Sequence, residues 1–169
     1  LLVGVSAAKA YAYALDIPIV AVNHIEGHVY ANELDGAPLR TPAVCLVASG
    51  GHTDIVHIET PGVYRIVGWT RDDAAGEAFD KIGRVLGLSH PGGPAIDACA
   101  REGDPGRIHF PRVHFPDSLD FSFSGLKTAA VRLWEREGQR FNVADFAASF
   151  QQAIVDVLVE HTFAAARQA

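Results

Sequence analysis

Two short apolar segments joined by a glycine-rich turn constrain the fold of this chain most. Residues 43–48 form an unbroken apolar run, residues 49–52 are Ser-Gly-Gly-His, and residues 53–58 have alternating character. Segments of this length on either side of a glycine-rich turn predict a β-hairpin. Residues 64–69 predict a further strand.

Helical patterns precede and follow the hairpin. We expect helices over residues 3–15, 24–33, 72–86, 94–100, 125–136 and 143–168, with Gly87 ending the third, and a short strand over residues 16–22. This mixture of strands and helices predicts an α/β protein. The turn Asp-Gly-Ala-Pro at residues 35–38 is the best candidate for a boundary between lobes.

Composition excludes several classes of protein. The net charge of −6 argues against a stand-alone nucleic-acid binder, which needs concentrated Lys and Arg. The chain contains no Met, so we expect it to be a segment of a longer protein. Cys45 and Cys99 are isolated and predict neither a disulfide framework nor a paired ligand motif. Lys9, Asp16 and Pro18 interrupt the apolar opening, which favours a cytoplasmic protein without a membrane span.

His24 and His28 form the first candidate site. Residues four apart on a helix share a face, so both imidazoles can point at one metal ion. The alternative is a pair of satisfied or solvent-facing histidines. Glu26 lies about 200° around such a helix from His24, which disfavours the zinc-peptidase arrangement.

Glycine turns form the second candidate site. Adjacent glycines in the sequence Ser-Gly-Gly-His-Thr at residues 49–53 allow backbone N–H groups to form an anion-binding concavity. The alternative is a tight turn that merely needs positive φ. A second pair, Gly92 and Gly93, comes directly before a predicted helix. Together the two pairs suggest a phosphate or nucleotide between them.

Carboxylates form the third candidate site. On a helix over residues 72–86, Asp73, Glu77 and Asp80 fall on one stripe. The alternative is a solvated acidic face, but three unpaired acids are tolerated best where they meet the hydroxyls or amines of a ligand. We expect Asp97, four residues after Gly93, to reach the same cleft.

Residues 121–128, Phe-Ser-Phe-Ser-Gly-Leu-Lys-Thr, lack the spacing of a phosphate loop. They predict instead a helix start that is capped by Ser124. Basic residues in this neighbourhood are candidates to face a polyanion: Arg107, Arg112, Lys127 and Arg132.

Five motifs in this order resemble the TsaD family, the tRNA N6-adenosine threonylcarbamoyltransferases once described as glycoprotein endopeptidases. They are Val-Asn-His-Ile-Glu-Gly-His at 22–28, Ser-Gly-Gly-His-Thr at 49–53, Asp-Asp-Ala-Ala-Gly-Glu-Ala-Phe-Asp-Lys at 72–81, Pro-Gly-Gly-Pro at 91–94 and the run at 121–128. The motifs are specific in combination, and the resemblance covers essentially the whole chain.

The resemblance implies an α/β, actin-like fold of two lobes, of the sugar kinase, Hsp70 and RNase H-like class. Residues 1–38 would be the end of the N-terminal lobe with the metal-binding helix, and residues 42–169 an incomplete second lobe. We therefore expect an internal piece that lacks both termini of the family. Such a piece alone is expected to bind metal poorly and to have no transfer activity.

The resemblance also implies an acyltransferase activity. A threonylcarbamoyl group would pass from threonylcarbamoyl-AMP to N6 of the adenosine beside the anticodon, in tRNAs that read codons starting with A. His24 and His28 would bind one divalent metal, Fe²⁺ or Zn²⁺, which acts as a Lewis acid. The residues that match the family's substrate contacts, for this ligand or another adenine nucleotide, are Val47, Ala48, Ser49, Gly50, Gly51, Asp80, Gly93 and Asp97.

Partners follow from the same resemblance. The tRNA surface would be shared with TsaB-like and TsaE-like subunits, in keeping with the acidic charge of this chain. Two alternatives stay open at this point: a metal-dependent glycoprotein endopeptidase, and a non-catalytic, nucleotide-binding actin-like subunit of the same complex.

Overall fold

The structure is a computed structural model that describes residues 2–34 and 36–169. The chain divides into two compact units, Leu1–Pro38 and Leu39–Ala169, which are described separately. The boundary follows the turn expected at residues 35–38, in which Asp35 lies outside the described residues. That the two units are the lobes of an actin-like fold stays a prediction.

Unit 1 consists of two helices, α1 (Leu2–Leu15) and α2 (His24–Tyr30), and a 3₁₀ turn, η1 (Ala31–Glu33). Both predicted helices are confirmed. The side chain of Asn23 accepts hydrogen bonds from the N–H groups of Ile25 (2.9 Å) and Glu26 (3.4 Å), which explains why α2 begins at His24. The strand predicted over residues 16–22 is wrong: this stretch is irregular, because no described segment of unit 1 offers a strand for it to pair with.

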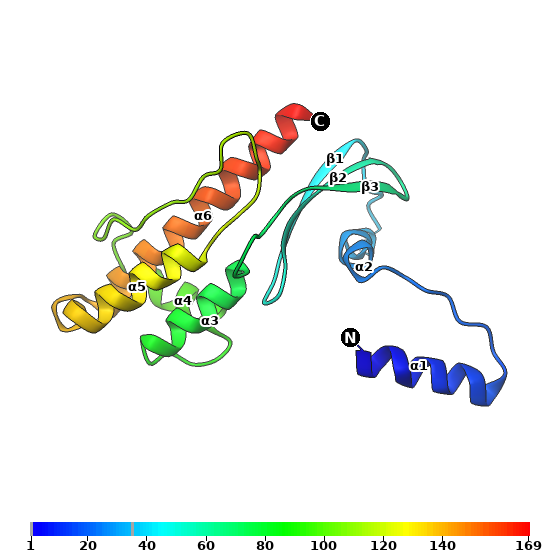
Figure 1. Ribbon diagram of the computed structural model, residues 1–169, viewed down its shortest axis with the longest axis horizontal. Helices are drawn as coiled ribbons and strands as arrows, with labels where there is room; N and C mark the ends of the chain where they lie inside the picture. Colours follow the sequence, from blue (N-terminus) through cyan, green and yellow to red (C-terminus); the bar gives the residue numbers. More distant parts are fainter. Residues whose placement is uncertain (1, 35) are drawn as a thin grey trace. The chain divides into compact units, whose positions relative to one another are not determined.

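Unit 2 begins with a three-stranded antiparallel sheet in the order β1-β2-β3 (Figure 1). Its strands are β1 (Ala43–Ala48), β2 (Thr53–Thr60) and β3 (Val63–Trp69). The predicted hairpin is confirmed, with Ala48 opposite Thr53 across the four-residue glycine turn.

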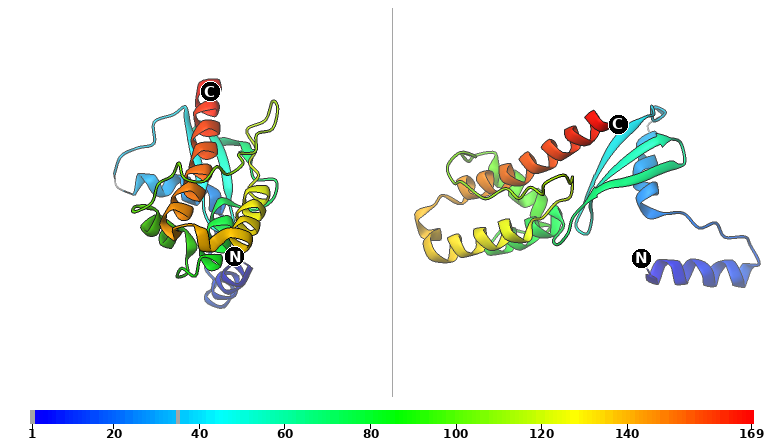
Figure 2. Two further views of the ribbon diagram at one scale, coloured as in Figure 1. Left: turned by 90° about the vertical axis from the view of Figure 1, so that its left-hand side faces the viewer. Right: turned by 45° about the horizontal axis from the view of Figure 1, so that its top comes forward.

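Four helices follow the sheet, namely α3 (Ala75–Val85), α4 (Gly92–Ala100), α5 (Ser124–Glu137) and α6 (Val143–Gln168), with a 3₁₀ turn, η2 (Gly138–Arg140), between the last two. Helix α3 packs against α4 and α5, and the long α6 packs against α4 and reaches β1 and β2 (Figure 2). Gly87 ends α3 as predicted: its φ is +74°, and Leu88 N–H donates to the Gly83 carbonyl at 2.8 Å.

Aromatic rings fill the core of unit 2. Phe146 and Phe150 lie one turn apart on α6, and both are fully buried. Their rings meet Phe110, Trp134 and Phe79 edge-on, with centroids 5.0–6.0 Å apart. These contacts tie α6 to α3, to α5 and to the irregular segment between α4 and α5.

The predicted helix over residues 72–86 begins three residues late, at Ala75. Asp72 is held instead at the start of α5, where its carboxylate accepts from the N–H groups of Phe123 (2.9 Å) and Ser124 (3.2 Å) and from the Ser122 hydroxyl (2.5 Å). Ser124 is therefore the first residue of α5, and the prediction that it caps this helix is wrong. Burial works to raise the pKa of Asp72, but these hydrogen bonds outweigh it and hold the pKa below its usual value.

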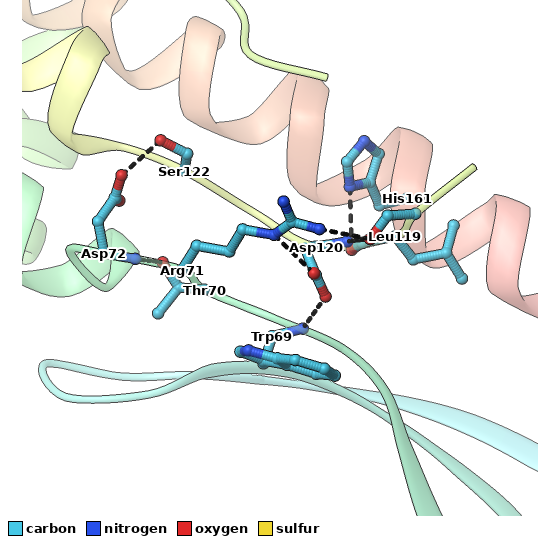
Figure 3. A network of polar contacts seen from close by, with 9 residues as sticks. Trp69, Thr70, Arg71, Asp72, Leu119, Asp120, Ser122 and His161 are labelled. Atoms are coloured by element: carbon cyan, nitrogen blue, oxygen red, sulfur yellow. Dashed lines mark hydrogen bonds and ion pairs between the residues drawn. The ribbon is translucent and has the colours of Figure 1, made fainter. Parts of the chain in front are cut away.

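A polar network fixes the end of β3 against the segment before α5 (Figure 3). Phe121 N–H donates to the Trp69 carbonyl, and Arg71 N–H donates to the Phe121 carbonyl, both at 2.9 Å. The buried Asp120 carboxylate accepts from Trp69 N–H at 3.2 Å and from Arg71 Nε at 2.8 Å. Burial alone would raise the pKa of Asp120, but the bonds from Arg71, Trp69 and Ser118 and the Arg71 charge lower it.

We predict that Asp120→Asn lowers the free energy of unfolding by about 1–3 kcal/mol at pH 7, because the Arg71 guanidinium loses its charged acceptor. A carboxylate with a lowered folded-state pKa stabilises the protein above its unfolded pKa, about 3.9, and this contribution is lost as the pH falls through the folded value. The stabilities of parent and variant in urea unfolding should therefore differ most at pH 7, and the difference should begin to shrink only as the pH falls below about 4. The exposed Asp117→Asn is the matched control, and an equal loss there would contradict the prediction.

Candidate functional site

The turn between β1 and β2 gathers backbone donors around one oxygen atom. The N–H groups of Gly51 (3.4 Å) and His52 (3.1 Å) both donate to the Ser49 hydroxyl, and Ser49 N–H donates to the His52 carbonyl at 2.8 Å. Converging N–H groups of this kind suit a phosphate or carboxylate oxygen. In this structure the serine hydroxyl fills that position.

Neither glycine of this turn is required by the backbone or by packing. The φ angles of Gly50 and Gly51 lie outside the left-handed region, so the alternative of a turn that needs positive φ does not apply. A Cβ added to either would meet no atom within 4 Å. The glycines therefore leave open space over the turn, which a ligand can approach closely.

Helix α3 holds the turn through a close backbone approach. Gly76 N–H donates to the Ser49 carbonyl at 3.2 Å, and a Cβ at Gly76 would lie 2.4 Å from that carbonyl oxygen and 2.7 Å from the Gly50 Cα. The Thr53 hydroxyl accepts from Ala75 N–H at 2.9 Å. The first turn of α3 can therefore contact the glycine turn directly because Gly76 has no side chain.

The second glycine pair packs on the same face of α3. A Cβ at Gly92 would lie 2.4 Å from the Phe79 carbonyl oxygen and 2.5 Å from the Asp80 Cα, and one at Gly83 would lie 3.0 Å from the Gly92 Cα. Gly76 and Asp80 lie on one helical face, roughly 6 Å apart along the helix axis at ~1.5 Å of rise per residue, so both glycine turns contact this face of α3. The structure therefore brings the two turns together.

Asp80 has one oxygen committed to the fold. Its Oδ1 accepts from Gly92 N–H at 2.6 Å, and the His90 Nδ1 lies 3.6 Å from the same oxygen. The side chain is 35% exposed, so its second oxygen remains accessible to a ligand. Gly93 follows with open space around its Cα.

Asp97 is held by protein groups on both oxygens. Its Oδ2 accepts from Arg101 Nη2 at 2.9 Å, and its Oδ1 accepts from Gln151 Nε2 on α6 at 3.2 Å. The hydrogen bonds from Arg101 and Gln151, with the Arg101 charge, lower the pKa of Asp97. A ligand at Asp97 would have to share or displace these partners.

The predicted stripe of three unpaired carboxylates is wrong. Asp73 precedes α3, where the Thr70 hydroxyl donates to its carbonyl at 2.6 Å, and its carboxylate forms an ion pair with Lys127. Glu77 and Asp80 remain on the helix. The tertiary contact with α5 therefore removes one acid from the stripe and neutralises its charge.

Two of the four basic residues that are candidates to face a polyanion form ion pairs within unit 2. Lys127 pairs with Asp73, and Arg112 pairs with Asp156 on α6 through its Nε at 2.9 Å. Both cations are thus matched by carboxylates within unit 2.

The histidine pair lies on α2 in unit 1, as the spacing predicts. The rings of His24 and His28 have centroids 5.7 Å apart and planes 71° apart, and both side chains are exposed. Among residues 2–34 and 36–169, no three His, Cys, Asp or Glu side chains form a ready-made metal site. The pair fits a metal as two neighbouring imidazole donors that leave further coordination positions open.

Several partners in and around this site escaped sequence reasoning. The role of Asp72 in capping α5 and the pairing of Arg71 with Asp120 both join residues about fifty positions apart. No local pattern signals such contacts. The glycine at position 76 was part of a motif, but its fit against Ser49 depends on the packing of α3 on the hairpin.

These features define an α/β protein with a glycine turn, whose N–H groups converge on the Ser49 hydroxyl, on one unit and a histidine pair on the other. The sequence profile of the TsaD family, described as tRNA N6-adenosine threonylcarbamoyltransferase, matches residues 1–169. The chain therefore belongs to the TsaD family. The fold of this family is actin-like, and the sheet and helices of the chain are consistent with part of it.

Curated relatives carry the same name. A tRNA N6-adenosine threonylcarbamoyltransferase of Syntrophomonas wolfei is 55% identical over 98% of this chain and 50% of its own length. The enzyme of Dehalococcoides mccartyi is 56% identical over 99% of this chain and 51% of its own length. That of Clostridium perfringens is 53% identical over 95% of this chain and 49% of its own length. The chain thus spans about half the length of these relatives. Within the described ranges, no helix combines the length and apolar character needed to cross a membrane.

We predict that two glycine substitutions differ in their effect on stability. Gly76→Ala should lower the free energy of unfolding by about 1–3 kcal/mol, because its Cβ would overlap the Ser49 carbonyl oxygen. Gly50→Ala should change it by less than about 0.5 kcal/mol, because that Cβ meets nothing. Urea unfolding at equilibrium measures both.

Gly125→Ala in α5 is the control for helix propensity, since its Cβ would make only an ordinary 3.9 Å contact with Val113. Alanine is favoured over glycine within helices by about 1 kcal/mol. A stabilised Gly76→Ala variant would show that propensity prevails and that the close approach to Ser49 is not a constraint.

Proposed function

We propose that this chain is part of a tRNA N6-adenosine threonylcarbamoyltransferase. The reaction transfers the threonylcarbamoyl group from threonylcarbamoyl-AMP to N6 of the adenosine beside the anticodon, in tRNAs that read codons starting with A. The observation that carries the proposal is the glycine turn held on α3, which supplies a polar, side-chain-free surface within a chain of the TsaD family.

The glycine turn is proposed to bind the AMP part of the donor. The backbone N–H groups of Gly51 and His52 would exchange the Ser49 hydroxyl for a phosphate oxygen as their acceptor. The free oxygen of Asp80 is suited to a ribose hydroxyl, since its other oxygen is fixed by Gly92. The remaining proposed contacts are Val47, Ala48, Gly93 and Asp97.

His24 and His28 are proposed to hold one divalent metal ion, Fe²⁺ or Zn²⁺. When bound, such an ion supplies Lewis-acid polarisation of a carbonyl group. The role of this chain is to present two imidazoles from neighbouring turns of α2, a helix whose start is fixed by Asn23. Two imidazoles leave coordination positions for other ligands and for substrate.

The tRNA is proposed to bind with the help of partner subunits of the TsaB and TsaE types, in the cytoplasm. A net charge of −6 gives this chain little attraction of its own for a polyanion. The ion pairs of Lys127 and Arg112 reduce it further. Basic surface from partners would therefore share the contact with tRNA.

We predict that the full-length protein, with its partner subunits, threonylcarbamoyl-AMP and unmodified tRNA, forms threonylcarbamoyl-adenosine. Replacing both His24 and His28 with Ala should abolish the product, because the metal loses two donors. Nucleoside analysis by mass spectrometry measures it, and His109→Ala, an exposed histidine on the segment before α5, is the control. Unchanged product formation by the double variant would overturn the metal role.

Two other outcomes would replace the proposal. Absence of the modified nucleoside, although nucleotide and metal both bind, would favour a non-catalytic subunit with the same fold. Cleavage of a protein substrate that persists through purification and is lost with the histidine pair would favour a peptidase.

We further predict that Asp80→Asn weakens the binding of AMP about tenfold or more. An Asn oxygen still accepts from Gly92 N–H, but the second position changes from an acceptor to a donor. Calorimetric titration with AMP measures the change, with Asp117→Asn as the charge-matched control. Equal affinities of parent and Asp80→Asn would remove Asp80 from the nucleotide site.

A further inference from the structure

A second histidine pair lies in unit 2, between α6 and the segment that precedes α5. His161 on α6 is 5% exposed, and its Nδ1 lies 3.1 Å from the Leu119 carbonyl oxygen (Figure 3). A carbonyl oxygen only accepts hydrogen bonds, so Nδ1 carries a proton. In the neutral ring, Nε2 therefore presents a lone pair.

The second imidazole faces this lone pair. His114 Nδ1 lies 3.4 Å from His161 Nε2, and the ring centroids are 5.5 Å apart. The His161 ring is held in place from another side by Phe121, which stacks on it at 5.2 Å with a 26° angle between planes. One imidazole is thus buried and fixed, and the other lies at its exposed edge.

A carboxylate is close to the pair. Glu160 Oε1 lies 3.9 Å from His114 Nδ1, and the side chains of Glu160 and His114 are 64% and 43% exposed. Both can turn without disturbing the core. No other Asp or Glu within the described part of the chain is paired with either histidine.

We propose that His114 Nδ1 and His161 Nε2, joined by the Glu160 carboxylate, bind one divalent transition-metal ion of the zinc type. Two nitrogens bound to tetrahedral zinc at ~2.0–2.1 Å lie about 3.3–3.4 Å apart, which matches the observed spacing. A histidine ligand commonly donates its other N–H to a carbonyl oxygen, as His161 does to Leu119.

The three donors are not arranged as a ready-made site, so binding requires His114 to rotate and Glu160 to swing inward. The competing arrangement is a neutral hydrogen bond from His114 Nδ1–H to His161 Nε2. The ion would replace the proton on His114 Nδ1, so metal binding releases a proton.

Binding would tie the segment before α5 to α6. This segment carries Asp120 and Ser122, which hold the chain at the end of β3 and before α3. An ion that binds only the folded state raises the unfolding temperature. This site does not depend on the proposed function and shares no residue with the histidine pair on α2.

The test is a Co²⁺ titration of the full-length protein in which His24 and His28 are both replaced by Ala. Tetrahedral Co²⁺ has an intense visible absorption band, and this band should disappear when Zn²⁺ displaces the Co²⁺ ion. His114→Gln removes an exposed donor and should weaken Co²⁺ binding about tenfold or more, while Glu160→Gln should weaken it less. The matched control is His109→Gln, an exposed histidine of the same segment.

The thermal midpoint provides a second readout. Zn²⁺ should raise it in the background protein and in His109→Gln, but not in His114→Gln. Circular dichroism without metal checks that His114→Gln is folded. Equal Co²⁺ affinities of His114→Gln and the background protein, or a spectrum without a tetrahedral band, would overturn the proposal and leave a hydrogen-bonded pair.

Discussion

The candidate site depends on the direct approach of α3 to two backbone turns. At Gly76 and Gly92 any side chain would overlap the neighbouring backbone, so α3 contacts Ser49 and α4 at distances that only glycine allows. This approach lets Gly76 N–H reach the Ser49 carbonyl and lets Asp80 receive the Gly92 N–H. Two turns that are forty residues apart in the chain therefore share one helix face.

The position of α3 depends in turn on the polar contacts before it. Asp120 and Asp72 hold successive residues after β3 to the segment that leads into α5. These carboxylates accept from backbone N–H groups of Trp69, Phe123 and Ser124, and the helix begins only at Ala75. The same contacts separate Asp73 from the acids of α3 and pair it with Lys127.

Local sequence patterns were sufficient to predict an element where its formation depends only on its own residues and their neighbours in the chain. The hairpin, the end of α3 at Gly87 and the start of α2 after Asn23 follow from turn and cap chemistry within a few residues. The strand predicted over residues 16–22 failed because a strand needs a partner that the pattern does not specify. The predicted start of α3 failed because donors about fifty residues away, the N–H groups of Phe123 and Ser124, bind the Asp72 carboxylate.

The sequence by itself determined the α/β class, the family and the residue types available for chemistry: paired imidazoles four apart and glycines beside hydroxyls. Only the tertiary structure decided which of these groups already have hydrogen-bond partners within the protein. It filled the donors of the glycine turn with the Ser49 hydroxyl, committed one oxygen of Asp80, and paired His161 with His114. The reason is physical: spacing fixes which side chains share a face, but packing between distant segments fixes which partner each polar atom meets.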